Sequence, residues 1–251
     1  MRGGLGEHEL GRQPARHGFG DADDVVTAGA RVARGADPAK DQSYVVHMLD
    51  QREIARTMFP IGAMTKSQVR ARATQIGLRT AAKPDSQDVC FIEASRGREE
   101  FLRQRITFTP ATIVDASSGE VLGSTKAAEL MTVGQRRGVL PGPDGERRFV
   151  AKVDLGARRV EVGRLEQVMV RSLAIEESSM SFSHDVLDDG TEVWAQWSAH
   201  GRAARATLRR GAGWSLELDE PARPVAAGQT VVLYRLDEPN VVQGAGIVAS
   251  S

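Results

Sequence analysis

The sequence contains very little cysteine and few aromatic residues. Cys90 is the only cysteine among 251 residues, so an internal disulfide is excluded and no cysteine cluster indicates a zinc site. The five histidines show no spacing typical of metal ligands, and we assign no metal. Aromatic residues make up 5% of the chain, whereas glycine contributes 26 residues. This balance favours small β modules and turns over one thick aromatic core.

The chain also lacks an excess of charge of either sign. Its 33 basic and 33 acidic residues give a formal net charge of zero, so polyanion binding requires a local patch. No apolar run is long enough to span a bilayer, and the N-terminus has no signal-type hydrophobic region. We therefore expect a cytoplasmic protein without membrane association.

Helix signals dominate the first part of the chain. Residues 1–22 mix Gly, Arg and His without periodicity, and we expect them to be disordered. Residues 41–60 are typical of one helix or a pair of helices. A clearer helix follows Thr65, because Gln68 can complete a capping box and Gly77 suits the C-terminal end.

Short apolar runs replace the helix signals from about Pro110 onward. Residues 111–123 read as a strand, a turn and a second strand, and residues 147–163 repeat that plan. Further alternating runs after Leu165 are typical of an antiparallel barrel or sandwich. We expect an unassigned segment, a helical region with the Cys90 loop, a small central β domain and a C-terminal β-barrel, at residues 1–22, 23–107, 108–164 and 165–251 respectively.

Cys90 stands in the stretch KPDSQDVCFI, where a polar loop enters a short apolar run. The loop would give access to a reactive thiol and the apolar run would fix its position. Lys83 would favour a thiolate, while Asp85 and Asp88 would oppose it. The local sequence alone favours an inert core cysteine, because free cysteines are mostly buried and unreactive.

The stretch KDQSY at residues 40–44 gathers polar groups of several kinds. Lys40 can contact a phosphate, and Gln42 can contact a base edge or a sugar. In the alternative interpretation this is a polar helix start, in which Asp41 and Ser43 satisfy exposed backbone amides. The local chemistry leaves both interpretations open.

Two arginine-rich stretches allow a similar choice. In TVGQRRG, Arg136 and Arg137 can hold phosphate oxygens, but arginine pairs recur along the chain and favour a solvated surface. In RAARATLRR, at residues 202–210, basic and apolar residues alternate, so one strand face would be cationic. Such a face suits a nucleic-acid backbone or a solvated edge strand.

Seven stretches, in the same order, resemble the tRNA-specific 2-thiouridylases, a family that installs sulfur on the wobble uridine. They are DPAKDQSYVV, MFPIGAMTKSQVRA, GLRTAAKPDSQDVCFI, FLRQRI, TVGQRRG, FVAKVD and AAGQTVVLYR. The resemblance covers roughly residues 24–251. It implies an α+β protein: a helical remnant of an α/β PP-loop domain (adenine nucleotide alpha hydrolase-like), a small β-rich central domain and a C-terminal antiparallel β-barrel.

The resemblance also implies a reaction and a set of residues. Family members use ATP to adenylate the C2 oxygen of the uridine, which makes it a leaving group. A cysteine at the position of Cys90 carries the sulfur as a persulfide, received from a sulfur-relay donor protein. The residues that it assigns to tRNA contact are Lys40, Asp41, Gln42 and Gln229. ATP is the expected co-substrate, and tRNA and the sulfur donor are the expected partners.

The sequence departs from the family's pattern in several places. It has no Ser-Gly-Gly-x-Asp-Ser loop for ATP and no second cysteine. We therefore expect the front of the enzyme to be missing here, through a truncated gene model or a genuine loss, with no cofactor-binding residue and no adenylation by this chain alone. A separate ATP-binding chain could then be a partner. TAGARV stands where the family has Thr-Gly-His-Tyr-Ala-Arg, and Thr125, Ala127 and Ser198 also differ from it.

Two other functions remain open at this point. The chain could be a non-catalytic remnant that binds tRNA or accepts sulfur. It could also be an unstable product whose front helices expose apolar faces.

Overall fold

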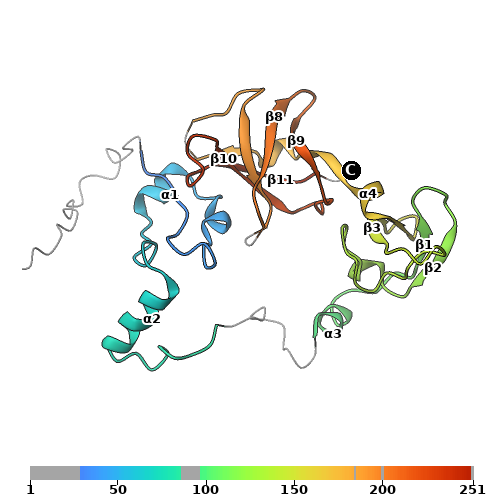
Figure 1. The fold of residues 1–251 in the computed structure, drawn as a ribbon, viewed down its shortest axis with the longest axis horizontal. Helices are drawn as coiled ribbons and strands as arrows, with labels where there is room; N and C mark the ends of the chain where they lie inside the picture. The colour runs from blue at the N-terminus through green and yellow to red at the C-terminus, as the bar shows by residue number, and fades with distance from the viewer. Residues whose placement is uncertain (1–28, 86–96, 184, 199–200, 250–251) are drawn as a thin grey trace, which may run out of the picture.

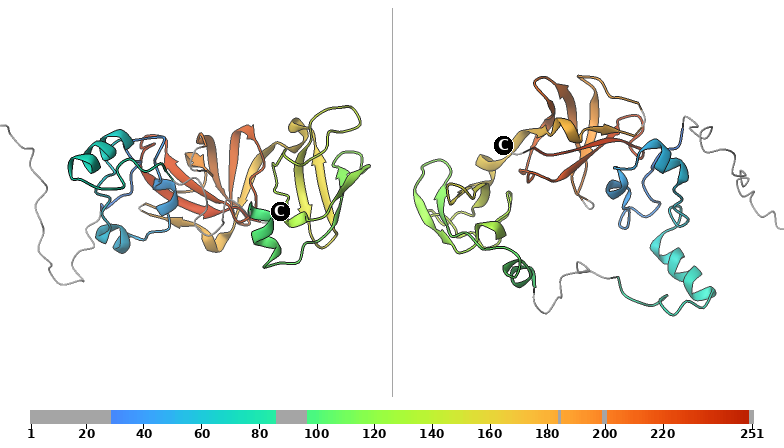
Figure 2. Two further views of the ribbon diagram at one scale, coloured as in Figure 1. Left: turned by 90° about the horizontal axis from the view of Figure 1, so that it is seen from below. Right: turned by 180° about the vertical axis from the view of Figure 1, so that it is seen from behind.

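The computed structural model describes residues 29–85, 97–183, 185–198 and 201–249. A curled seven-stranded sheet lies between a helical segment and a four-stranded sheet (Figures 1 and 2). The expected α+β class with a C-terminal antiparallel barrel is confirmed. The predictions for residues 1–22 and for Cys90 fall outside the described residues.

Three short helices form the segment that precedes the first gap. They are η1 (Ser43–Val46), α1 (Gln51–Arg56) and α2 (Lys66–Gln75). The first two confirm the predicted helix pair. Both hydrogen bonds of the predicted capping box at α2 form: the Thr65 side chain accepts from the Gln68 amide, and the Gln68 side chain accepts from the Thr65 amide. Gly77 has a φ of +71°, as predicted for the C-terminal end of this helix.

The side chains of α2 are all at least partly exposed. Apolar side chains on either side of it are exposed as well, including Phe59 at 51%, Ile76 at 57% and Leu78 at 51%. Residues 58–78 therefore carry apolar surface that nothing in the described part of the chain covers.

The earlier part of this segment is attached to the barrel. Ala33 forms an antiparallel bridge with Val241, and the Arg34 amide donates to the Asn240 carbonyl at 2.8 Å. A small apolar cluster seals the contact; its buried members are Val32, Ile54, Val232, Tyr234, Val242 and Ala245. Residues 32–34 thus lie against β11 like a short additional strand.

The four-stranded sheet follows α3 (Gly97–Arg103). Its strands are β1 (Ala111–Asp115), β2 (Val121–Thr125), β3 (Phe149–Asp154) and β4 (Arg159–Gly163), and η2 (Ala128–Leu130) lies between β2 and β3. The order is β2-β1-β4-β3, so the two predicted hairpins are joined through a parallel pair, β1 and β4. Buried side chains of β1, β3 and β4, together with Ala128, fill its core.

The seven-stranded sheet has the order β5-β9-β8-β7-β10-β11-β6, and all its pairs are antiparallel. Its elements are α4 (Leu165–Val168), β5 (Val170–Ile175), η3 (Glu177–Ser179), β6 (Ser181–Phe182), β7 (Glu192–Gln196), β8 (Ala204–Arg210), β9 (Trp214–Ala222), β10 (Thr230–Arg235) and β11 (Val242–Ile247). A bridge between Ile175 and Val248 brings β5 to the end of β11. The sheet therefore curls around its core, as expected for a barrel.

Alternation along β8 follows the prediction, and its pairing shows where it lies in the sheet. Ala206 and Leu208 are buried, whereas Arg205, Thr207 and Arg209, which alternate with them, are at least partly exposed. The strand pairs with both β7 and β9. Of the two alternatives left open for this strand, the edge position is therefore excluded; the sequence of one strand does not reveal which strands pair with it.

A buried ion pair stabilises the four-stranded sheet. Asp115, at the end of β1, accepts hydrogen bonds from the Ser117 hydroxyl at 2.6 Å and from the Ser117 amide at 3.0 Å. Its other oxygen lies 3.3 Å from Nε of Arg148, whose side chain is 6% exposed. The Ser117 hydroxyl is the main reason that the pKa of Asp115 falls to about 2. The carboxylate thus ties the β1–β2 turn to the start of β3.

We expect Asp115→Asn to destabilise this sheet by about 1–3 kcal/mol at pH 7, because Arg148 loses a charged partner. The pKa of Asp115 is lower in the folded state than its usual 3.8, so its stabilisation is present above pH 4. That stabilisation disappears as the pH falls through about 2. The difference between wild type and variant should therefore shrink over the same interval.

Urea unfolding, followed through amide NMR signals of β1 and β4, measures the effect in this sheet alone. Asp154→Asn is the matched control: Asp154 accepts a turn hydrogen bond from the Ala157 amide at 2.7 Å but has no cationic partner among the described residues. Equal losses in the two variants would show that the charge on Asp115 contributes nothing.

Candidate nucleic-acid interface

Two of the predicted tRNA-contacting stretches meet at the barrel surface. Gln229, in the turn before β10, donates from Nε2 to Oη of Tyr44 at 2.8 Å. Tyr44 belongs to η1 and follows Gln42 by two positions. Residues 185 positions apart in the sequence are thereby brought into one surface.

Asp41 organises the loop that carries these residues. Its Oδ1 accepts hydrogen bonds from the amides of Gly35 at 2.9 Å and Ser43 at 3.0 Å, and its Oδ2 accepts one from the Ser43 hydroxyl at 2.9 Å. Arg34 lies 3.5 Å from the same carboxylate, which is 9% exposed. The helix-start interpretation therefore describes Asp41 and Ser43 well.

Arg34 connects the loop to the barrel wall. Its Nη2 donates to Oε1 of Gln196 at 2.6 Å, and its guanidinium carbon lies 4.0 Å from the centre of the Tyr234 ring. Burial raises the pKa of Tyr234, so this phenol stays neutral at physiological pH. Arg34 therefore fixes the position of Asp41 relative to β7 and β10.

The side chain of Gln42 is exposed and forms no hydrogen bond within the described residues. Gln229 uses its amide nitrogen for Tyr44, while its carbonyl oxygen remains available to a donor. These two amides are suited to contact a polar ligand at this surface.

Lys40 takes part in a separate cluster centred on Asp85. The carboxylate lies 2.9 Å from Nζ of Lys40, 2.7 Å from Nζ of Lys66 and 3.5 Å from Nη2 of Arg70. Hydrogen bonds from Lys40 and then Lys66 hold the pKa of Asp85 far below its usual range. Three cations share one carboxylate, so the cluster keeps a positive charge that can attract phosphate.

The Asp85 cluster also anchors the stretch that leads to Cys90. Lys66 and Arg70 lie one turn apart on α2, and Arg70 donates to the Lys83 carbonyl at 3.1 Å. Asp85 is the last described residue before the gap that contains Cys90. Cys90 itself lies outside the described residues, so the structure fixes the start of its loop.

The arginines of β8 are neutralised by neighbouring strands. Arg205 lies 2.7 Å from Glu192 on β7 and 3.4 Å from Asp219 on β9, and Arg209 lies 2.8 Å from Glu217 on β9. Cross-strand ion pairs of this kind keep an exposed face soluble. They favour the solvated-face interpretation of this strand over a nucleic-acid contact.

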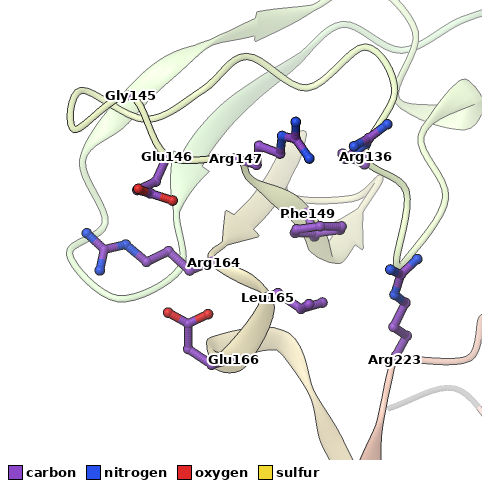
Figure 3. Close-up of a pocket in the computed structure, with 9 residues that line it drawn as sticks. All are labelled: Arg136, Gly145, Glu146, Arg147, Phe149, Arg164, Leu165, Glu166 and Arg223. Atoms are coloured by element: carbon purple, nitrogen blue, oxygen red, sulfur yellow. The ribbon is translucent and has the colours of Figure 1, made fainter.

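The loop TVGQRRG differs from β8, because one of its arginines lines a pocket. Gln135 is internal to the loop: its Oε1 accepts from the Thr132 amide at 3.0 Å and its Nε2 donates to the Arg137 carbonyl at 2.6 Å. Arg136 lines a pocket of about 780 Å³ at the junction with the barrel (Figure 3). The other lining residues are Gly145, Glu146, Arg147, Phe149, Arg164, Leu165, Glu166 and Arg223.

Sequence reasoning missed this pocket. Three of its arginines come from separate segments, at positions 136, 147 and 223, and only one of those segments had drawn attention as a phosphate-binding candidate. The recurrence of arginine along the chain was the available signal, but it favoured a solvated surface.

Metal and membrane features are absent from the part of the chain that the structure describes. In these residues no group of three or more His, Cys, Asp or Glu side chains is arranged to hold a metal ion. None of the helices formed by these residues has the length and apolar character needed to cross a bilayer.

Comparisons with known proteins agree on one family. The profile described as the tRNA methyl transferase HUP domain matches residues 20–94, and the one described as the tRNA methyl transferase PRC-barrel domain matches residues 99–164. The tRNA-specific 2-thiouridylase MnmA of Salinispora arenicola is 41% identical over 222 residues, which cover 86% of this chain and 61% of that protein.

Relatives from other organisms give similar values. The tRNA-specific 2-thiouridylase MnmA of Rhodococcus erythropolis is 38% identical over 229 residues, covering 87% of this chain and 61% of that protein. The protein of the same name from a Mycobacterium species is 40% identical over 211 residues, covering 82% and 58%. The chain thus spans about three fifths of the length of these relatives.

We expect Asp85→Asn to raise the rate at which Cys90 reacts with iodoacetamide at pH 7. Loss of one negative charge roughly 10 Å from a thiol in water changes its ionisation, and hence this rate, by about twofold. The three cations left without their carboxylate favour the thiolate. Because Cys90 is the only cysteine, mass spectrometry of the whole chain reports on this residue alone.

Asp237→Asn is the control, because Asp237 pairs with Arg235 at 2.9 Å on the barrel and takes no part in the Asp85 cluster. Asp85→Glu should keep the wild-type rate, and high salt should reduce the effect. An unchanged rate in Asp85→Asn would show that the cluster does not influence Cys90.

Proposed function

The chain belongs to the tRNA-specific 2-thiouridylase family, and on that premise we propose that it takes part in ATP-dependent sulfur transfer to C2 of the wobble uridine of tRNA. The observation that carries the proposal is the hydrogen bond between Gln229 and Tyr44. It gathers residues from two distant stretches, both assigned to tRNA contact by resemblance, into one surface.

The proposed contacts divide by chemistry. Lys40 binds a phosphate oxygen, since its cluster keeps an excess of positive charge. Gln42 and Gln229 offer amide groups to a base or a sugar. Asp41 contributes chiefly by shaping the loop, because both its oxygens already accept hydrogen bonds within the chain.

Cys90 is proposed to carry the sulfur. Its thiolate attacks the sulfane sulfur of a persulfide donor; the donor leaves as a thiol and Cys90 becomes the persulfide. The terminal sulfur of that persulfide then attacks C2 of the adenylated uridine, and AMP leaves with the former O2 oxygen. A second thiol releases the thiouridine by forming a disulfide with Cys90. Residues 1–251 hold no second cysteine, so that thiol lies outside this sequence.

A second candidate is a protein that binds tRNA or accepts sulfur while a separate ATP-binding chain performs the activation. In this division of labour the present chain contributes Cys90 and the surface formed by the loop at residues 40–42 and Gln229. Both candidates require tRNA binding. They differ in whether thiouridine forms when the chain receives only tRNA, ATP and a sulfur donor.

We expect Cys90 to accept one radiolabelled sulfane sulfur from a persulfide donor, in a form that dithiothreitol removes. Cys90→Ser should accept none. The double variant Ser86→Cys/Cys90→Ser keeps one thiol in the same stretch, KPDSQDVCFI, but nearer its start, and should accept the sulfur more slowly than wild type. Acceptance by the double variant at the wild-type rate would contradict a dedicated role for Cys90.

We expect Gln42→Ala and Gln229→Ala each to weaken binding of an unmodified tRNA transcript by about fivefold, the effect of one lost hydrogen bond. Filter binding at 50 and 200 mM salt measures this affinity and its salt dependence. Gln104→Ala is the matched control, because Gln104 follows α3 and its side chain bonds to Glu100 alone among the described residues, at 3.1 Å. Wild-type chain without affinity for tRNA would overturn the proposed function.

A further inference from the structure

The pocket at the junction of the two sheets has an uneven distribution of charge. Arg136, Arg147 and Arg223 surround the ring of Phe149, whereas Glu146, Glu166 and Arg164 gather on the opposite side (Figure 3). Arg164 is neutralised by Asp144, whose carboxylate lies 2.5 Å from its Nη2. Glu146 and Glu166 therefore leave that side of the pocket acidic, whereas the side around Phe149 is basic.

The three arginines on the basic side have no acidic partner. No carboxylate among the described residues forms an ion pair with Arg136, Arg147 or Arg223. The contrast with β8 is direct, because Arg205 and Arg209 there each face a carboxylate within 2.8 Å. Like charges that gather without compensation leave a site for an anion.

Hydrogen bonds and an ion pair of neighbouring residues hold the backbone segments that carry Arg136 and Arg147. The loop that carries Arg136 is bonded to β3: Gly134 donates to the Val150 carbonyl at 2.8 Å, and Val150 donates to the Gln135 carbonyl at 2.9 Å. Arg147 adjoins Arg148, which is fixed by its buried pair with Asp115. The basic side thus sits on a supported backbone.

Arg223 brings the barrel into the same pocket. Its guanidinium carbon lies 5.6 Å from the centre of the Phe149 ring, and Phe149 is 7% exposed. An aromatic floor fixes the plane of a guanidinium while its N–H groups stay free for a ligand. Two structural units therefore contribute cations to one site.

One guanidinium group can donate two parallel hydrogen bonds to the oxygens of a phosphate. Three guanidinium groups in one pocket therefore suit a ligand with several phosphates better than a ligand with a single carboxylate. The pocket is lined by residues of the loop before β3, of β3 and of the start of α4, and by Arg223 of the barrel. The four-stranded sheet and the helical segment that carries residues 40–42 lie on opposite sides of the barrel (Figures 1 and 2). A ligand that contacts both the pocket and residues 40–42 therefore has to extend across the barrel.

We propose that Arg136, Arg147 and Arg223 bind backbone phosphates of the tRNA at a place remote from the nucleotide that receives sulfur. This site rests on the proposed function, since tRNA is the ligand of both. It extends the interface from the loop at residues 40–42 to the junction of the central sheet and the barrel. The phosphates that it binds position the RNA without reading its sequence.

The experiment uses the full chain and an unmodified tRNA transcript. Replacing Arg136, Arg147 and Arg223 together by Gln should weaken binding at least tenfold at 100 mM salt. The slope of log K against log salt should become shallower by about 2, because up to three phosphate contacts are lost. Arg205→Gln/Arg209→Gln is the matched control, as it removes cations that are already paired; its affinity and slope should stay near wild type.

A variant with Lys at positions 136, 147 and 223 keeps the three positive charges. Comparing it with the triple Gln variant separates the effect of lost charge on tRNA binding from a defect in folding. It should retain most of the salt slope and recover part of the affinity. Triple Gln and wild-type chains with the same affinity and slope, while Gln42→Ala still weakens binding, would overturn this site and leave the proposed function intact. If millimolar inorganic phosphate, at constant ionic strength, abolished tRNA binding by the wild-type chain, the pocket would be a site for a small phosphate. That result would also overturn the proposed site for tRNA.

Discussion

The attachment of residues 29–56 to the outer wall of the barrel is the contact on which the candidate interface depends. Val32, Tyr234 and Val242 exclude water from it, and the bridge between Ala33 and Val241 sets its register. Arg34 then links Tyr234 to Asp41, and Asp41 shapes the loop before η1. Without this contact nothing would fix the position of the loop at residues 40–42 relative to Gln229, because 185 positions separate Tyr44 from Gln229 in the sequence.

Local features of the fold were predictable, and pairings between distant segments were not. The capping box at Thr65 and Gln68 depends on residues three positions apart, and the hairpins depend on alternation around a turn. The parallel pair of β1 and β4, and the meeting of Ile175 with Val248, join segments that carry no mutual signal in a single sequence. They follow from burial of apolar faces in three dimensions.

In the candidate site, too, individual residues were predictable from the sequence and their contacts with distant segments were not. Resemblance identified Lys40, Gln42 and Gln229, but no pattern in the sequence indicated that Lys40 would share Asp85 with two cations of α2. The local sequence was misleading for two groups of arginines. The alternating arginines of β8 resembled a binding face and are neutralised by acids on neighbouring strands, while those of the junction pocket resembled ordinary surface and lack such acids. Whether an arginine is free depends on its neighbours in space.

The exposed helix α2 implies an order of events when the protein is heated. Ten residues form a helix that is marginal by itself in water, and α2 buries none of its side chains. Its tertiary ties are polar: the Lys66 amide donates to Asp37 at 2.9 Å, and two of its cations bind Asp85. The barrel, with a continuous apolar core, has no such weakness. Melting should therefore begin at α2 and release the start of the Cys90 loop while the barrel is still folded.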